Sequence, residues 1–536
     1  MSERQPIYIL PENVQRIMGK DAQRNNIMAA RIVAETVKTT LGPKGMDKML
    51  VNSIGDIIVT NDGVTILEEM EIEHPAAKMM VEIAKTQDKE VGDGTTTAVM
   101  LAGKLLENAE KLLDQKIHPT VITKGYRLAS EKAQELIRTL AINIESDENI
   151  LKELVYTSLA SKNAAAKKEK FAQIIVKAVK QISENGNIDL DNIKIEKVRG
   201  EGIEDTELVE GIVLDKERVS VDMPQRVELA RIALIDAALE IKGPETEAKI
   251  SVTSPEQLQS FMEREERILK EMVAKIKQSG ANVVFCQKGI DDVAQYYLAK
   301  EKIYACRRIA KSDMEKLARA TGGKIVSNWN ELSSEQLGSS NVVEGIKDGD
   351  NNYTLVRGCR NPKALTILIR GGTEHVISEI ERALKDGMGV VASALKDKKI
   401  LPGAGAIEVE LARRLRDYAI TLGGREQLAV EEFASSLEFI PVTLAENAGL
   451  DPIDILTELR ARHMKGEINA GLNLLNGKIE DSILAGIIEP IRIKTQAIDS
   501  ATEVAVMILR IDDVIASSSK SGKGMPSGMP PMNDME

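Results

Sequence analysis

The sequence predicts a multidomain α/β protein in which two mainly helical sections enclose an α/β section. The chain has 536 residues, 43% of them hydrophobic. At roughly 150 residues per domain, this length predicts about three or four domains with buried cores. Apolar residues recur at spacings of three and four near both ends of the chain, which is the helical pattern. Between these sections, short apolar runs alternate with helical stretches, which is the α/β pattern.

The first helical section opens with a predicted helix over residues 21–40. Its apolar spacing predicts one buried face formed by Ile27, Met28, Ile32, Val33, Thr36 and Val37. Residues 41–45 end this helix because they contain two glycines and a proline. Beyond them, residues 57–59 and 64–66 predict a hairpin whose turn is Asn61-Asp62-Gly63. Residues 92–97 then lead directly into a second apolar helix.

Short apolar runs in the middle of the chain predict buried strands over residues 232–236, 281–286 and 364–369. Beyond residue 400, we expect helices over residues 407–415 and 425–438, and loops at residues 469–473 and 488–490. Residues 517–536 contain Ser, Gly, Pro and Met without periodicity, which predicts a disordered tail.

One amphipathic helix is conspicuous in the α/β section, over residues 255–278. Ser254 and Gln257 form a capping box at its start, with Pro255 at the first helical position, and Gly280 closes its far end. Its apolar stripe consists of Leu258, Phe261, Met262, Ile268, Leu269, Met272, Val273 and Ile276.

Charge and composition exclude several functions. There are 71 Lys and Arg against 83 Asp and Glu, a formal charge of −12, whereas a nucleic-acid binder needs clustered basic residues. One Trp, eight Tyr and five Phe leave little with which to stack bases. We therefore expect no nucleic-acid partner.

The cysteines and the N-terminus predict a cytoplasmic protein. Cys286, Cys306 and Cys359 are an odd number without metal-ligand spacing, which favours neither disulfides nor a zinc site and fits a reducing compartment. No basic stretch followed by an apolar core begins the chain, and no apolar run approaches the roughly 18 residues of a membrane span. We expect no membrane association.

The strongest local signal is Gly92-Asp93-Gly94-Thr95-Thr96-Thr97. Small residues let a phosphate approach the backbone, the amides of a helix start point at it, and threonine hydroxyls add donors. Asp93 is a natural ligand for a Mg²⁺ that bridges phosphates. By itself, this motif is equally compatible with an ordinary glycine-rich helix start.

Two further loops strengthen the nucleotide interpretation. Alone, residues 41–45 are an ordinary helix stop and residues 61–63 an ordinary hairpin turn. Both occur within 60 residues of the threonine-rich loop. Together they predict two glycine loops that clamp phosphates, with Asp62 available for water and Asp93 for a metal.

Several long segments resemble a known family. They are TTLGPKGMDKML (39–50), VTNDGVTIL (59–67), HPAAKMM (74–80), EVGDGTTTAVM (90–100), LAENAGLDPIDIL (444–456) and KTQAIDSATE (494–503). In this order, they look like the group II chaperonin subunits, the archaeal thermosome and its eukaryotic cytosolic relatives. The resemblance runs from about residue 8 to 515.

The resemblance implies subunits of a double-ring barrel, each with a mainly helical equatorial ATPase domain, an α/β intermediate domain and an α/β apical domain with a helical protrusion. The equatorial domain would comprise residues 1–145 and 404–516, the intermediate domain 146–214 and 370–403, and the apical domain 215–369. Residues 244–279 would form a built-in lid. On periodicity alone, the amphipathic helix within them could equally pack inside a globular core.

The same resemblance implies a role for each matching residue. Asp62 and Asp386 would position and activate the attacking water, Asp93 would bind Mg²⁺, and Lys162 would sense the γ-phosphate of ATP. The remaining nucleotide contacts would be Leu41, Gly42 and Pro43 at the border, Gly94, Thr95, Thr96 and Thr97 at the phosphates, and Gly403, Gly405, Gly471 and Glu489 on the nucleoside side. Without the resemblance, Asp386 and Lys162 read as solvated surface charges.

Two positions depart from the family pattern. Where the family usually shows three glycines, this chain has Gly403-Ala404-Gly405, and a methyl group there would crowd the nucleotide if residue 404 needs a positive φ. Gly387 replaces the usual alanine after Asp386, which would loosen a helix by roughly 1 kcal/mol.

The predicted function is an ATP-driven folding chaperonin that uses ATP, ADP and Mg²⁺, binds non-native polypeptides and assembles with other chaperonin subunits. Two alternatives from other classes are a scaffold whose rings polymerise and a monomeric small-molecule kinase. The number of subunits per ring, and whether the ring is homo- or hetero-oligomeric, stay open.

Overall fold

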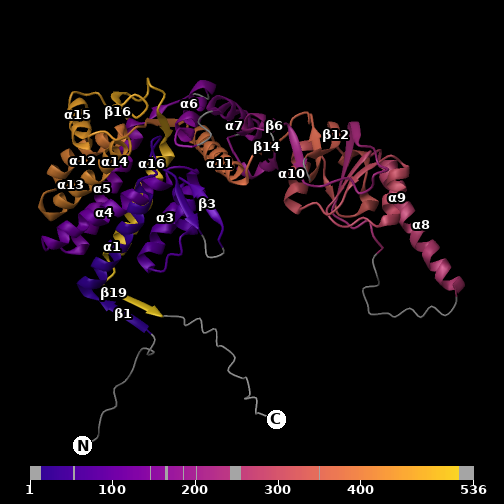
Figure 1. The fold of residues 1–536 in the computed structure, drawn as a ribbon, viewed down its shortest axis with the longest axis horizontal. Helices are drawn as coiled ribbons and strands as arrows, with labels where there is room; N and C mark the ends of the chain where they lie inside the picture. Colours follow the sequence, from indigo (N-terminus) through magenta and orange to yellow (C-terminus); the bar gives the residue numbers. More distant parts are fainter. Residues whose placement is uncertain are drawn as a thin grey trace, which may run out of the picture.

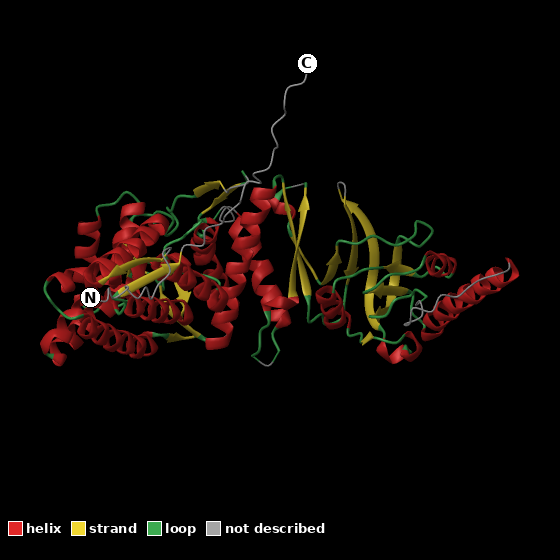
Figure 2. Ribbon diagram, turned by 90° about the horizontal axis from the view of Figure 1, so that it is seen from below, coloured by secondary structure: helices red, strands yellow, loops and turns green. Residues whose placement is uncertain are grey.

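The chain folds into three adjacent sections, visible from left to right in Figure 1 and coloured by secondary structure in Figure 2. The computed structural model describes residues 14–51, 55–144, 147–162, 167–184, 186–200, 202–241, 255–348 and 351–517. Helices and several sheets alternate as expected, so the α/β class is confirmed. Ser254 of the predicted capping box and all but the first residue of the predicted tail lie outside the described residues.

The helical section combines both ends of the chain. Its helices are α1 (Gly19–Lys38), α2 (Gly63–Glu69), α3 (Pro75–Val91), α4 (Thr95–Asp114), α5 (Pro119–Leu140), α12 (Ala406–Leu422), α13 (Gly424–Leu437), α14 (Phe439–Asn447), α15 (Pro452–Met464) and α16 (Ile491–Leu509). Helix α4 packs against α1, α3, α13 and α16, and its Val99, Leu105 and Leu106 are fully buried. The loop that precedes α4 is therefore attached to the centre of this core.

Small antiparallel pairings border the helical section. They join β1 (Val14–Met18) to β19 (Asp513–Ser517), β2 (Lys48–Val51) to β3 (Ile57–Thr60), and β16 (Ala470–Asn473) to β17 (Lys478–Asp481). A three-stranded sheet, in the order β18 (Ile488–Pro490), β15 (Lys399–Pro402) and β4 (Ile142–Asn143), lies where the chain passes to the middle section.

The middle section consists of three helices and a three-stranded sheet. Its helices are α6 (Glu148–Leu159), α7 (Lys168–Ile182) and α11 (Glu374–Asp397), and its strands are β5 (Ile193–Arg199), β14 (Leu365–Gly371) and β6 (Glu207–Val209) in the order β5-β14-β6. The predicted domain border between residues 369 and 370 falls inside β14, whose partners are both middle-section strands.

The third section is built on a seven-stranded mixed sheet. Its strands are β7 (Gly211–Leu214), β8 (Arg226–Ile235), β9 (Val283–Cys286), β10 (Tyr304–Cys306), β11 (Ile325–Val326), β12 (Gly338–Asp348) and β13 (Asn351–Arg357), and its helices are α8 (Pro255–Ser279), α9 (Asp292–Lys300) and α10 (Lys311–Thr321). Strands β8, β9 and β14 confirm the three buried strands predicted in the middle of the chain.

Helix α8 projects from the outer end of the molecule (Figure 1). Its C-terminal half packs into the section's core through Leu269, Met272, Val273 and Ile276. Near its start, Phe261 and Met262 are 42% and 61% exposed. The apolar stripe is therefore only half buried, and packing wholly within a globular core is excluded for these two residues.

Three local predictions are wrong. Residues 64–66 belong to helix α2 rather than to a hairpin strand, and β3 pairs instead with β2. Met28 and Ile32 of α1 are 53% and 54% exposed, because the buried line of this helix follows Ile27, Ala30, Ala34 and Val37. The expected loops at residues 469–473 and 488–490 contain strands β16 and β18. Strand β16 pairs with β17 across a tight turn, and β18 pairs with β15, which lies far away in the sequence.

The three cysteines are free and buried. Burial raises the pKa of each thiol, to about 11 for Cys286, so all three stay protonated and unreactive. Among the described helices, none has the length and apolar character that crossing a membrane requires.

Candidate nucleotide site

The threonine-rich loop ends in an open helix N-terminus. Gly94 is the N-cap of the 20-residue helix α4 with φ +81°, and no side chain caps the helix there. The backbone amides of the first turn are therefore available to a ligand, and the helix dipole favours a negative charge in front of them. Thr95 and Thr96 are buried with their hydroxyls close to the neighbouring loops.

Asp62 is held in place by the start of helix α2. Its Oδ2 accepts hydrogen bonds from the Thr65 backbone amide at 3.1 Å and the Thr65 hydroxyl at 2.6 Å, while its Oδ1 accepts from the Thr95 hydroxyl at 3.4 Å. The Asn61-Asp62-Gly63 motif is thus a helix cap, which explains why the hairpin prediction failed: an aspartate cap stabilises a helix as readily as a turn. This cap fixes the carboxylate beside the phosphate loop.

These loops surround one small cavity of about 100 Å³. Its lining contains the predicted residues Leu41, Gly42, Asp62, Asp93, Gly94, Thr95, Thr96, Thr97, Lys162 and Asp386, together with Thr40, Asn61, Gly63, Gly92 and Ser161. Five separate chain segments therefore meet at the open start of α4. Pro43, Gly403, Gly405, Gly471 and Glu489 are predicted site residues that do not line this cavity.

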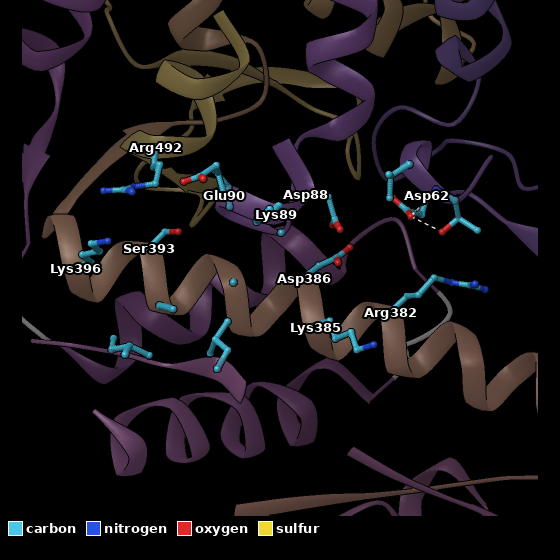
Figure 3. A pocket seen from close by; sticks show the side chains of 18 of the residues that line it. Asp62, Asp88, Lys89, Glu90, Arg382, Lys385, Asp386, Ser393, Lys396 and Arg492 are labelled. Carbon is cyan, nitrogen blue, oxygen red and sulfur yellow. Dashed lines mark hydrogen bonds between the residues drawn. The ribbon is translucent and has the colours of Figure 1, made fainter. Parts of the chain in front are cut away.

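A larger cleft of about 500 Å³ adjoins the small cavity and shares Asp62, Gly92 and Asp386 with it. The cleft lies between α3 and α11, and Figure 3 shows Asp386 on α11 and Asp88 on α3 pointing toward one another across it. Partial burial, together with the carboxylates of Asp62 and Glu68, raises the pKa of Asp88. The small cavity therefore adjoins an open cleft whose lining carries both acidic and basic side chains.

Lys162 and Asp386 form a buried ion pair between α11 and the loop that follows α6. Lys162 Nζ contacts Asp386 Oδ2, and the two side chains are only 8% and 14% exposed. Burial and the nearby Asp62 and Asp93 raise the pKa of Asp386 well above its usual range, although Lys162 opposes this. Burial disfavours the ammonium of Lys162, but the three carboxylates raise its pKa. Three carboxylates thus face a single ammonium.

This excess of negative charge suits a divalent cation. Asp93 Oδ1 accepts a hydrogen bond from the Gly94 amide at 2.6 Å, and Gln87 holds the Asp93 carbonyl at 2.8 Å, so the carboxylate is oriented. Within the described ranges, no three His, Cys, Asp or Glu side chains cluster as a metal site. A Mg²⁺ at Asp93 would therefore complete its shell with phosphate oxygens and water, which is its usual habit.

The predicted nucleoside-side residues form a second group beside the cavity. A carbon added at Gly403 would lie 3.1 Å from Glu489 Oε1, and one added at Gly471 would lie 3.0 Å from the Ala404 methyl. Lys494 Nζ bridges Glu489 at 2.8 Å and Glu408 at 2.7 Å. Burial, and then the negative charges of Glu408 and Asp93, raise the pKa of Glu489 against the effect of Lys494.

Ala404 adopts the positive φ that makes a side chain costly. Its φ is +58°, in the left-handed region that costs a non-glycine residue about 1 kcal/mol. The contact with Gly471 places its methyl group against β16. Gly471 on the facing strand has no side chain, so it leaves space for the methyl group of Ala404 where the family usually has a glycine.

Sequence reasoning missed Thr40, Asn61 and Ser161. Asn61 Nδ2 donates to the Ser161 carbonyl at 2.6 Å, which ties the Asp62 loop to the segment that carries Lys162. The Thr40 and Thr96 hydroxyls lie 3.5 Å apart. Adjacency to Asp62, Lys162 and Leu41 is the only signal in the sequence that could have indicated them.

An open helix start with threonine donors, a lysine and converging carboxylates defines a nucleotide-hydrolysing protein. The chain matches the TCP-1/cpn60 chaperonin family over residues 33–519 and belongs to that family. A thermosome subunit of Methanopyrus kandleri is 60% identical over 520 residues, which cover 96% of this chain and 95% of that subunit. The thermosome subunits beta and alpha of Archaeoglobus fulgidus are 59% and 56% identical, each over 98% of this chain and over 98% and 97% of their own lengths.

Family membership confirms the resemblance found in the sequence. The chain is an ATP-hydrolysing chaperonin subunit of a double-ring chamber for protein folding. This function excludes the polymerising scaffold and the monomeric kinase as its main role.

Proposed function

We propose that Asp62 and Asp386 together handle the water that attacks the γ-phosphate of ATP, while Lys162 binds that phosphate. The observation that supports this is the meeting of all three side chains at the open start of α4. Residues 162 and 386 are 224 positions apart and are paired within the middle section, where α6 packs on α11, whereas Asp62 belongs to the helical section.

Asp386 is the better proton acceptor of the two carboxylates. Its raised pKa, caused chiefly by burial, makes it a stronger base than an ordinary aspartate, and the adjacent Lys162 ammonium favours its ionised form against this rise. Asp62 has its Oδ2 engaged by Thr65, so it orients the water instead. As the water oxygen bonds to the γ-phosphorus, its proton passes to the Asp386 carboxylate, and the bond from the γ-phosphorus to the β–γ bridging oxygen breaks, so that ADP leaves with that oxygen.

The phosphates would lie on the amides of Thr95, Thr96 and Thr97, with Leu41, Gly42 and Pro43 along their border. Mg²⁺, when bound at Asp93, supplies charge neutralisation between phosphate oxygens. The nucleoside would lie toward Gly403, Gly405, Gly471 and Glu489, because these residues continue the site beyond the cavity.

The outer parts of the molecule would serve substrate handling. We assign the three sections to equatorial, intermediate and apical domains, with α8 as part of a lid that includes residues 244–254 outside the described range. Exposed Phe261 and Met262 would bind non-native polypeptides. Other copies of this chain, or related subunits, would complete each ring, and the cytoplasm is the proposed compartment.

The test of the hydrolytic mechanism is Asp386→Ala. Removing the proton acceptor should lower the maximal rate of ATP hydrolysis about 100-fold, while ADP affinity stays the same. Glu374→Ala is the matched control, because this carboxylate also lies on α11 but its side chain is 70% exposed. Undiminished turnover in the Asp386 variant would refute the proposed role.

A further inference from the structure

We propose that a backbone contact between Gly92 and Gly389 positions Asp386 over the phosphate loop, so that Gly389 is a positioning residue for ATP hydrolysis. The inference rests on the role proposed for Asp386. Gly92 directly precedes Asp93 of the phosphate loop, and Gly389 lies one helical turn after Asp386 on the same face of α11. The contact thus joins the two segments that carry the reacting groups.

The approach at this contact leaves no room for a side chain. A carbon added at Gly389 would lie 2.5 Å from the Val91 carbonyl oxygen and 3.2 Å from the Gly92 Cα. On the other side, a carbon added at Gly92 would lie 3.4 Å from the Gly389 Cα and 3.8 Å from the Asp386 Cα. Backbone therefore meets backbone, and no rotamer change could absorb an added methyl group.

The end of α3 is rigid on its own side. Gly92 is the left-handed C-cap of α3, with φ +78°, and its amide donates to the Asp88 carbonyl. The Val91 side chain is 2% exposed and belongs to the same hydrophobic core as Met388 of α11. Any group inserted at Gly389 must therefore lift α11, and Asp386 with it.

A shift of this kind matters because proton transfer depends on short distances. Asp386 reaches the cavity between α11 and α4, and its partner Lys162 is anchored on the middle section. Misplacement of a reacting group by about 1 Å can cost about a hundredfold in rate. The nucleotide loops lie on the other side of the contact, so nucleotide affinity should be unaffected.

The experiment measures ATP turnover and ADP affinity of the assembled protein for Gly389→Ala and Gly389→Val. We expect the maximal rate to fall about tenfold for alanine and further for valine, with ADP affinity within about twofold of the wild type. Gly387→Ala is the matched control on the same helix. Its added methyl would meet the flexible end of Ile175, 2.7 Å away, and should leave turnover close to the wild-type rate.

A double variant separates positioning from a general structural effect. If Gly389 acts through Asp386, then adding Gly389→Ala to Asp386→Ala should lower turnover no further. A merely structural effect of the clash would lower the thermal midpoint, and its loss of rate would persist when Asp386 is already replaced by alanine. Wild-type turnover in both Gly389 variants, or additive losses in the double variant, would overturn the inference. Full activity of Asp386→Ala alone would instead refute the proposed mechanism.

Discussion

At the scale of single residues, buried charges dominate this molecule. Asp386 and Lys162 look like ordinary surface residues in the sequence, yet their side chains are largely buried against each other. Two other carboxylates, Asp62 and Asp93, lie near this ion pair and give the site an excess of negative charge. The role of Lys162 and Asp386 therefore depends on their charged neighbours in the fold and not on their neighbours in the sequence.

A second buried charge cluster stabilises the helical section. Glu410 is fully buried, and its carboxylate accepts hydrogen bonds from Arg413 at 2.6 Å, Arg414 at 2.7 Å and His463 at 2.9 Å. The other ring nitrogen of His463, Nε2, lies 2.9 Å from the Ala470 carbonyl oxygen, next to Gly471. Burial would raise the pKa of Glu410, but these donors lower it to about 2.

The lowered pKa predicts an acid-sensitive contribution to stability. Because the unfolded carboxyl, with a pKa of 4.5, binds a proton more readily, the stabilisation is complete above about pH 5 and is lost as the pH falls toward 2. Glu410→Gln should lower the free energy of unfolding at neutral pH by up to about 3 kcal/mol. Thermal unfolding of both proteins between pH 2 and pH 7 tests this, and the difference between them should shrink with acid.

Glu458→Gln provides the control for that measurement. Its side chain is 51% exposed and pairs with Arg462 on the surface, so its loss should change stability by less than about 1 kcal/mol at any pH. An equal effect of the two substitutions, or a difference that is independent of pH, would contradict the account of Glu410.

At the scale of elements, periodicity predicts helices well and their environment poorly. Helix α1 and helix α8 both appear where the apolar spacing places them. Met28 and Ile32 are nevertheless exposed on α1, and Phe261 and Met262 on α8. An apolar stripe on a helix predicts that another surface packs on it. That surface can belong to another subunit or to a substrate instead of to the same chain.

The exposed start of α8 yields a prediction about substrate capture. Replacing Phe261 and Met262 with serine removes the large exposed apolar groups of this region without touching its buried half. Retention of a denatured model protein should weaken at least about tenfold, since each apolar side chain that the substrate buries contributes about 1.5–3 kcal/mol and 1.4 kcal/mol corresponds to a factor of about ten. Light scattering during refolding measures this, with exposed Gln259→Ser as the control. Unchanged suppression of aggregation would assign capture elsewhere.

The threonine-rich loop shows the opposite case, because the helix that residues 92–97 were predicted to lead into begins there as α4. Glycine at the start of α4 and three threonines after it act through their own backbone and hydroxyls, so the motif carries its chemistry locally. The Asp62 motif was recognised as functional, but its structure was misassigned because helix caps and turns use the same residues.

At the scale of the whole molecule, the three sections contact one another in sequence between the candidate nucleotide site and helix α8. Helix α11 of the middle section packs on α3 and α16 of the helical section and on strands β5 and β14 of its own sheet, and β14 in turn contacts β7 of the third section. A movement of α11 relative to α3 would therefore be felt both at Asp386 and in the sheet of the middle section. ATP binding is coupled to this movement if ATP stabilises one arrangement of α11 and α3 more than the other.

This arrangement predicts that the protrusion can be removed without loss of hydrolysis. Deleting residues 246–264 eliminates the exposed start of α8 but leaves its buried part, which includes Leu269 and Met272. The shortened protein should hydrolyse ATP at close to the wild-type rate, yet fail to protect a bound substrate from added protease. Electron microscopy should show rings that stay open with ATP. Closed, protective rings in this variant would refute the lid assignment.

The main helices, the glycine- and threonine-rich start of α4 and the family could all be predicted from the sequence alone, because they depend on spacing and contiguous motifs. Only the tertiary structure decided that Lys162 meets Asp386, that Asp62 caps α2, that Ala404 has a positive φ and that Gly389 contacts Gly92. These features join segments up to hundreds of residues apart. No local pattern encodes such contacts, since they depend on how whole sections pack around one core.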